Sequence, residues 1–460
     1  MKYTLLVLLY ASTLFSAVIE TNEGTFLQIY ADKDPQSNIV ATVSVDKGKI
    51  DTSRCFNTRD DAQWCQIKYT QNGVSINGFS DKKSLDSIAL RANKKPTFEA
   101  NYGGRYSEVG NAILPLEDGI LLVGTTESFG KGQNDVYVVK VDHFGNKIWS
   151  GAYGGGGVDI AKSVVAVKDG FMLAGTTRSF GNRIQSLYLA KISESGNLRW
   201  QKGYYSDKDD YYTGNSMVMI NDNNLLIAGH EDHVKFFDSE INFYLNAINT
   251  DGQRNGIKRY GGNKVEKANS IISVEDGYVI AGETDTYGHG GKDSYVVKIN
   301  KDGDRIWHSA FGWRYDEITK QIIETKDGGY IMVGTTDSDH SNQKDVYVVK
   351  IKKDGNRAWQ YHYGSKEHEE GNAIVETEDG YVITGYTKDT QSYNRNVYLL
   401  KIDKVGNVLW HKNYGENSDD EGNAIAKVKD GFVITGYTTS KDSNSKDLYL
   451  LKVDNNGNIN

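Results

Sequence analysis

The chain has 460 residues, a formal net charge of −8 and 25% charged residues. This length predicts two or more domains, and the acidic balance argues against nucleic acid as the main partner. Tyr is abundant, Pro is scarce and runs with helical periodicity are hard to find, so the composition favours a soluble all-β protein.

Residues 1–17 (MKYTLLVLLYASTLFSA) have the organisation of a secretory signal peptide. Lys2 supplies the charged start, Leu5–Leu9 form the apolar centre, and the end is small and polar. This run is too short to span a membrane, and no other stretch is apolar enough to do so. We therefore expect a secreted or periplasmic protein, cut after Ala17, without a transmembrane segment.

Residues 20–90 lie outside the repeat described below and contain several strand-like runs. The only two cysteines, Cys55 and Cys65, are expected to lie opposite each other on a hairpin that turns around Asp60-Asp61. In an exported protein such a pair predicts a disulfide bond. A metal or catalytic role is less favoured, because no His lies near either cysteine in the sequence.

The second half of this unit carries the run Trp64-Cys-Gln-Ile-Lys-Tyr69, a short turn, then Asn77-Gly78-Phe79 and Leu85. This run resembles the C-terminal half of a bacterial SH3-like domain. The resemblance implies a small β-barrel over residues 20–90, and some members of that family bind peptidoglycan or peptides. Residues 86–95 are interpreted as a linker.

A repeat with a period of about 51 residues fills the rest of the chain, from residue 96 to residue 460. An aromatic residue closes each unit, and Gly256 takes its place in the third interval. A period near 50 that contains only strands is typical of β-propeller blades, so the pattern predicts seven blades. The closing aromatics are Phe98, Trp149, Trp200, Trp307, Trp359 and Trp410.

Four strands are predicted in each unit, and residues 371–414 show them most clearly. The first two strands, 371–378 and 381–387, flank an Asp-Gly pair, which is a strong hairpin signal. The other two are 396–403 and 406–414. The last unit stops before its closing aromatic, so Pro96–Gly104 is predicted to pair with it and close the ring, with Phe98 in the Trp position.

Two further positions recur in every unit. A Gly after the second strand's apolar core is interpreted as a place where backbones or large rings come close, and a Tyr in the third strand is interpreted as inter-blade packing. The glycines are Gly124, Gly175, Gly229, Gly282, Gly334, Gly385 and Gly436, and the tyrosines are Tyr137, Tyr188, Tyr244, Tyr295, Tyr347, Tyr398 and Tyr449.

The closing pattern, such as Gly145-Asn-Lys-Ile-Trp149 or Gly406-Asn-Val-Leu-Trp410, is similar to the tryptophan-docking repeat of quinoprotein-like propellers. That resemblance implies that the Trp residues are wedges between blades. Enzymes of that family commonly have eight blades, and the alcohol-oxidising ones carry a vicinal Cys pair. This chain has seven units and no such pair, so no quinone or other cofactor is expected.

An acid recurs just before the first strand of six units, and a Tyr replaces it in the third. The set is Glu108, Asp159, Tyr212, Glu266, Glu317, Glu369 and Asp420. Six carboxylates near one rim would form a cation-attracting mouth. Alternatively, each carboxylate accepts backbone N–H bonds within its own blade or from the next, and the regular recurrence favours this structural interpretation.

The third unit is irregular: it lacks the Trp and is longer than the others. Its first loop, Tyr204–Tyr212, is acidic and aromatic and begins with the pair Tyr204 and Tyr205. Its second loop holds His230-Glu-Asp-His233 followed by Phe236 and Phe237. His230 and His233 are candidate metal ligands, although a loop does not fix their spacing. A protein-recognition patch of exposed Tyr and Phe is favoured over a metal site.

Three functional hypotheses remain. The leading one is an exported, monomeric, non-catalytic adaptor that contacts peptidoglycan or a peptide through the first domain, and an envelope protein or glycan through the propeller loops. The second is a polysaccharide hydrolase or lyase that uses rim carboxylates as acid and base, which requires two acids with separated pKa values around a deep pocket. The third is an architectural protein without a small ligand.

Overall fold

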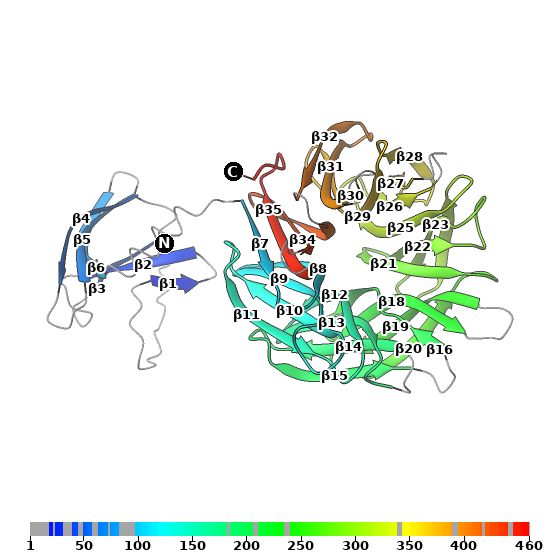
Figure 1. Cartoon of the computed structure of the whole chain (residues 1–460), viewed down its shortest axis with the longest axis horizontal. Coiled ribbons are helices and arrows are strands. Elements are labelled where there is room, and N and C mark those ends of the chain that lie inside the picture. The colour runs from blue at the N-terminus through cyan, green and yellow to red at the C-terminus, as the bar shows by residue number, and fades with distance from the viewer. Residues whose placement is uncertain are drawn as a thin grey trace. The chain divides into compact units, whose positions relative to one another are not determined.

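The structure is a computed structural model of the whole chain (Figure 1). It describes residues 18–459 except 22–23, 31–38, 45–48, 58–62, 72–73, 82–96, 182–184, 206–209, 234–239, 338–342, 389–393, 416–418 and 440–444. The predicted signal peptide and linker lie outside these described residues. Every described element is a β-strand, and no described segment forms a helix suited to crossing a membrane.

The chain divides into two compact units, Met1–Lys95 and Pro96–Asn460. The first contains a six-stranded sheet in the order β1-β2-β6-β5-β4, with β3 paired to β2. Its β4 and β5 pair so that Cys55 lies directly opposite Cys65. The strands are β1(Val18–Thr21), β2(Gly24–Tyr30), β3(Ile39–Ser44), β4(Lys49–Asn57), β5(Gln63–Gln71) and β6(Val74–Asp81).

The second unit consists of seven antiparallel sheets, so the predicted all-β fold with a seven-bladed propeller is confirmed (Figure 1). Blades 1 to 3 are β8(Glu108–Leu116), β9(Gly119–Thr126), β10(Asp135–Val141), β11(Lys147–Tyr153); β12(Asp159–Val167), β13(Gly170–Thr177), β14(Ser186–Ile192), β15(Leu198–Tyr204); and β16(Asp210–Tyr212), β17(Ser216–Asn221), β18(Asn224–His233), β19(Glu240–Asn249), β20(Arg254–Tyr260).

Blades 4 to 7 follow the same order, and the last is completed by a strand from before blade 1. They are β21(Glu266–Val274), β22(Gly277–Thr284), β23(Asp293–Asn300), β24(Arg305–Phe311); β25(Glu317–Glu324), β26(Tyr330–Thr336), β27(Asp345–Ile351), β28(Arg357–Tyr363); β29(His368–Glu376), β30(Gly380–Lys388), β31(Arg395–Asp403), β32(Val408–Tyr414); and β33(Glu421–Val428), β34(Gly431–Thr439), β35(Lys446–Val453), β7(Phe98–Tyr102).

Ring closure occurs where it was predicted. Strand β7 pairs with β35, and Phe98 lies opposite Lys452 (Figure 1). In blades 1, 2, 4, 5 and 6 the closing Trp lies opposite the equivalent Lys, as Trp149 does opposite Lys140. Phe98 therefore occupies the Trp position of blade 7, and the edge that an open ring would expose is paired.

A hydrogen bond between adjacent blades accompanies each closing aromatic. At the end of the fourth strand, the Tyr102 hydroxyl donates to the Gly145 carbonyl at 2.6 Å, and Tyr153 donates to Gly196 at 2.5 Å. The same bond joins the next blade at Tyr204, Tyr260, Tyr363 and Tyr414, and Ser309 supplies it in blade 4. This contact between blades was not predicted from the sequence.

The recurring Gly of the second strand is needed because the first strand carries a β-bulge beside it. The register of β8 shifts between Gly110 and Ala112, and a Cβ on Gly124 would lie 1.8 Å from the Val109 carbonyl oxygen. At all seven glycines that distance is between 1.7 and 1.9 Å. The prediction of close backbone approach is confirmed, and in six of the seven blades the first strand bulges at this point.

Candidate functional site

The recurring acids lie inside the blades. Each of the six carboxylates is at most 3% exposed. In blade 1, Glu108 accepts the Gly104 N–H at 2.8 Å and the Thr126 hydroxyl at 2.7 Å. Equivalent bonds hold Asp159, Glu266, Glu317 and Glu369. These contacts agree with the structural interpretation, in which each recurring acid accepts backbone N–H bonds. The buried carboxylates therefore present no ring of charge to solvent.

A second carboxylate faces the recurring acid across four of the blade interfaces. It comes from the Asp that begins the third strand of the preceding blade. Both carboxyl groups of one such pair lie beside Gly154. A Cβ built on Gly154 would be 2.1 Å from Asp135 Oδ1 and 2.6 Å from Asp159 Oδ2, so the two carboxyl groups are close neighbours. The pairs are Asp135/Asp159, Asp293/Glu317, Asp345/Glu369 and Asp447/Glu108. Neighbouring like charges favour protonation of one partner.

One of these pairs lines a cavity of about 700 Å³ between blades 5 and 6. The chemically active side chains on its wall are Asp345, His362, Glu367, Glu369, Tyr398 and His411. At the preceding interface Trp313 covers the equivalent wall, because its ring packs against Tyr347 and His362 at centroid distances of 5.3 and 5.9 Å. Ser365 replaces Trp313 between blades 5 and 6, so Glu369 remains in contact with the cavity.

Asp345, His362 and Glu369 bring an acid and a base together in this cavity. The Nδ1 of His362 lies 2.8 Å from Asp345 Oδ2. If Nδ1 carries the proton that this contact requires, Nε2 is free to accept one. Burial raises the pKa of Glu369, and the nearby charge of Asp345 raises it further, while hydrogen bonds from Ser365 oppose the increase. Glu369 is thus biased to the protonated form beside an oriented imidazole.

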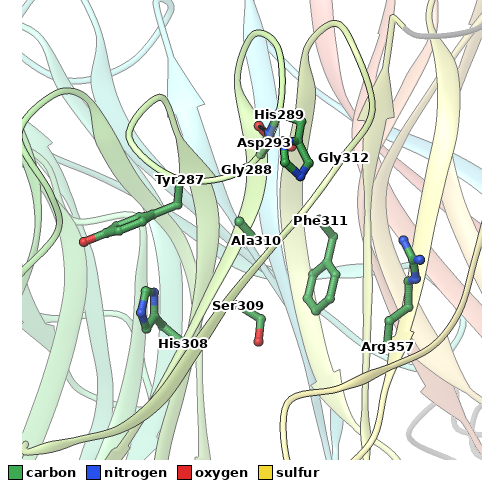
Figure 2. Close-up of a pocket in the computed structure, with 10 residues that line it drawn as sticks. All are labelled: Tyr287, Gly288, His289, Asp293, His308, Ser309, Ala310, Phe311, Gly312 and Arg357. Atoms are coloured by element: carbon green, nitrogen blue, oxygen red, sulfur yellow. Dashed lines mark hydrogen bonds between the residues drawn. The ribbon is translucent and has the colours of Figure 1, made fainter.

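A second, smaller cavity of about 560 Å³ is lined almost entirely by blade 4, with Arg357 of blade 5 at its edge (Figure 2). Burial raises the pKa of Asp293 to about 6, with the His289 N–H opposing and Glu317 adding to the increase. Figure 2 shows His308 and Arg357 on opposite sides of the cavity. His308 bonds to the Tyr295 hydroxyl at 3.0 Å rather than to a carboxylate. This cavity therefore has a titrating acid without the oriented base.

Sequence reasoning missed Asp345 and His362. The residue paired with the recurring Tyr of the third strand could have identified His362. In blades 1, 2 and 4 this residue is small: Ala152, Gly203 and Ala310. Blades 5, 6 and 7 carry the polar residues His362, Asn413 and Asn101 there. A small residue is needed where a loop covers the strand, as at Gly203, whose Cβ would lie 2.2 Å from the Phe180 carbonyl oxygen.

In the irregular third blade the hydroxyl group precedes the first strand and the acid lies on the second strand, the reverse of the other blades. Tyr212 is buried and its hydroxyl donates to Glu231, on the second strand, where most other blades carry a Thr. Arg259 also bonds to Glu231. Tyr204 is buried and bonded to Gly252, whereas Tyr205 is 42% exposed. The candidate Phe236 lies outside the described residues.

Of the two candidate metal ligands, both of which lie on β18, only His230 has a side chain that the structure describes. His230 Nδ1 lies 3.0 Å from the Thr213 hydroxyl, and burial together with Lys267 and Lys162 lowers its pKa to about 3. Within the described part of the chain, no three His, Cys, Asp or Glu side chains are grouped to hold a metal ion.

No family model matches the sequence, and no curated protein matches it. The chain resembles the phage phi92 endosialidase (10% identity, TM-score 0.46, covering 78% of this chain and 69% of that one). It also resembles the polysaccharide lyase Uly1 (11%, 0.45, 77% and 91%) and the hemagglutinin-neuraminidase ectodomain of parainfluenza virus 5 (9%, 0.37, 81% and 94%). At these identities the likeness shows the fold alone.

The leading prediction, a non-catalytic adaptor, is corrected. The structures that match include, by name, an endosialidase, a polysaccharide lyase and a β-1,2-mannobiose phosphorylase, and the likeness is one of fold. The adaptor prediction rested on the lack of a catalytic constellation in the sequence. Asp345 and His362 were overlooked there, and the fold brings them into one cavity with Glu369.

Proposed function

We propose that the propeller is a polysaccharide-cleaving enzyme whose active site is the cavity between blades 5 and 6. The observation that carries this proposal is the raised pKa of Glu369 beside the His362–Asp345 pair in an open cavity. Hydrolysis of a glycosidic bond requires one protonated acid and one base on the two sides of that bond. This cavity supplies both.

In the proposed reaction Glu369 donates its proton to the glycosidic oxygen as that bond breaks. His362 Nε2 accepts a proton from the water that attacks the sugar carbon, and Asp345 stabilises the resulting imidazolium through Nδ1–H. Tyr398 and Val408 give the cavity an apolar wall that suits a sugar ring face. The products are two shorter saccharides, and no bound cofactor enters the reaction.

The experiment is a screen of the purified full chain against neutral and acidic polysaccharides. Reducing ends measure hydrolysis, and absorbance of an unsaturated product measures elimination. Glu369→Gln is expected to lower the rate by about 10²–10⁴-fold. Glu317→Gln is the matched control, because Glu317 has the same repeat position and burial but does not line a cavity. Equal rates in both variants, or no cleavage of any polymer, would exclude the proposal.

We also propose that the chain is exported through residues 1–17, that its first unit is an SH3-like barrel, and that Cys55 and Cys65 form a disulfide. The opposed register of the two cysteines supports the last point. Mass measurement of the secreted protein after alkylation, with and without prior reduction, tests both export and bonding. Two alkylated cysteines without reduction would exclude the disulfide.

A further inference from the structure

Seven residues occupy equivalent positions on or beside the innermost strands: six lie at the bulge of a first strand, and Asn215 directly precedes β17 in blade 3. We call this set the axial ring: Asn111, Lys162, Asn215, Asn269, Lys320, Asn372 and Asn423. The first strands of adjacent blades contact one another around the whole ring, including β33 with β8. The first strand is therefore the innermost element, and its bulged residue faces the axis.

The five asparagines of the axial ring tie adjacent blades together. Each donates its side-chain N–H to a backbone carbonyl in the first strand of the next blade, at 2.8 to 3.1 Å. Asn423 completes the circle by donating to the Gly110 carbonyl at 2.9 Å. The preferred residue of this position is thus Asn, because one short amide joins two blades.

Lys162 and Lys320 depart from this arrangement. No described contact shows either lysine making the bond to the next blade's carbonyl. Lys162 Nζ instead donates to Asn215 Oδ1 at 2.9 Å. Burial, with repulsion from Lys320, lowers the pKa of Lys162. Compared with the asparagines, the two lysines therefore lack the inter-blade bond and repel each other near the axis. Such a local conflict is typical of a functional position.

The remaining charges next to the axial ring are already paired, within the described ranges. Lys267 lies 3.8 Å from Glu283, Lys344 lies 3.4 Å from Glu370, and Arg395 pairs with Glu421. Lys320 contributes to lowering the pKa of Glu370 but lies within 4 Å of no described carboxylate, and the same holds for Lys162. The ring therefore carries two lysines that have no carboxylate partner within 4 Å among the described residues.

From this arrangement we infer an oxyanion-binding site between Lys162 and Lys320, suited to a phosphate or sulfate group. Blades 2 and 5 are three steps apart in a ring of seven, so the two ammonium groups approach the axis from nearly opposite sides. Lys162 is exposed to solvent despite the surrounding protein, so small ions can reach it. A tetrahedral anion bridging both lysines would remove their repulsion, since ammonium groups bind phosphate as point charges.

The test is calorimetric titration of the full chain with sodium phosphate and sodium sulfate, against sodium chloride at matched ionic strength. We expect saturable binding of phosphate or sulfate by the natural chain. In Lys162→Asn/Lys320→Asn, which restores the residue used at the other five positions, the affinity should fall at least tenfold. The same variant should melt at a higher temperature than the natural chain in chloride, because repulsion is lost and two inter-blade bonds become available.

The charge-matched control is Lys147→Asn/Lys264→Asn, which removes two exposed lysines outside the axial ring and should bind like the natural chain. Glucose 6-phosphate and glucose 6-sulfate distinguish a free ion from an ester: tighter binding of an ester identifies a ligand-borne group. Binding that is no stronger than for chloride, or equal affinity in the ring variant, would overturn the inference. These readouts do not depend on polysaccharide cleavage.

Discussion

The carboxyl groups of Asp293 and Glu317 lie side by side across the interface of blades 4 and 5. A Cβ on Gly312 would lie 2.1 Å from Asp293 Oδ1 and 2.4 Å from Glu317 Oε2. Trp313 N–H and the Thr336 hydroxyl bond to Glu317, whereas Asp293 Oδ1 is buried without a partner among the described residues. Two carboxylates so placed repel unless one holds a proton.

This relationship predicts that Asp293→Asn stabilises the protein at neutral pH. Burial and Glu317 raise the pKa of Asp293 from 3.8 to about 6. Because the folded state holds this proton more tightly, stability is lost as pH rises from about 4 to 6. The Asn variant lacks that loss, so its unfolding free energy should exceed that of the natural chain by about 1–3 kcal/mol at pH 7.

Urea unfolding from pH 4 to pH 8 measures this difference, which should shrink toward pH 4. The chain itself uses Asn at this position at two other interfaces, Asn242 beside Glu266 and Asn396 beside Asp420. Asp222→Asn, on an exposed turn, is the control and should change nothing. A destabilised Asp293→Asn protein at pH 7 would contradict the pairing.

The seam that closes the ring gives a second prediction. Phe98→Ala should lower stability by about 1–3 kcal/mol, because its ring packs against Gly145 of blade 1 and its strand completes blade 7. Phe98→Trp supplies the residue of the other blades and should retain stability. The thermal midpoint measures both, and an unchanged midpoint for Phe98→Ala would show that β7 is not docked.

The fold was predictable because it repeats. Seven copies of one strand pattern identify the strands, the turns and the ring-closing role of Phe98, since each copy constrains the others. Contacts between blades were less visible: the sequence marks Tyr102 as one more aromatic, and only the register shows its hydroxyl reaching the Gly145 carbonyl. The β-bulge that turns Asn111 and Lys162 inward likewise has no signal of its own in one sequence.

The candidate site was not predictable for the opposite reason. A repeat pattern identifies what the copies share and gives no weight to the residues in which one copy differs. The catalytic proposal depends on two such differences: Ser365 in place of Trp313, and His362 in place of Ala310. Glu369 was singled out only as one member of a recurring set. Its distinct environment comes from blade 5, which supplies His362 bonded to the Asp345 that faces Glu369.

The third blade gives a prediction about compensation. Glu231→Thr removes the carboxylate to which Tyr212 and Arg259 both bond, so it should cost about 3 kcal/mol. Adding Tyr212→Glu restores the acid-and-Thr order of the other blades and should recover at least half of that loss. Chemical denaturation of the single and double variants measures this recovery. A double variant no more stable than Glu231→Thr would show that the exchange is not compensatory.

The proposed chemistry predicts how activity depends on pH. Glu369 acts in its protonated form, so kcat/KM should fall at high pH, at a pKa above the usual range of a Glu because burial raises it. Asp345→Asn, which no longer favours Nδ1–H on His362, should reduce kcat with little change in KM. If Glu369→Asp does not move the high-pH limb of the profile, Glu369 is not the acid.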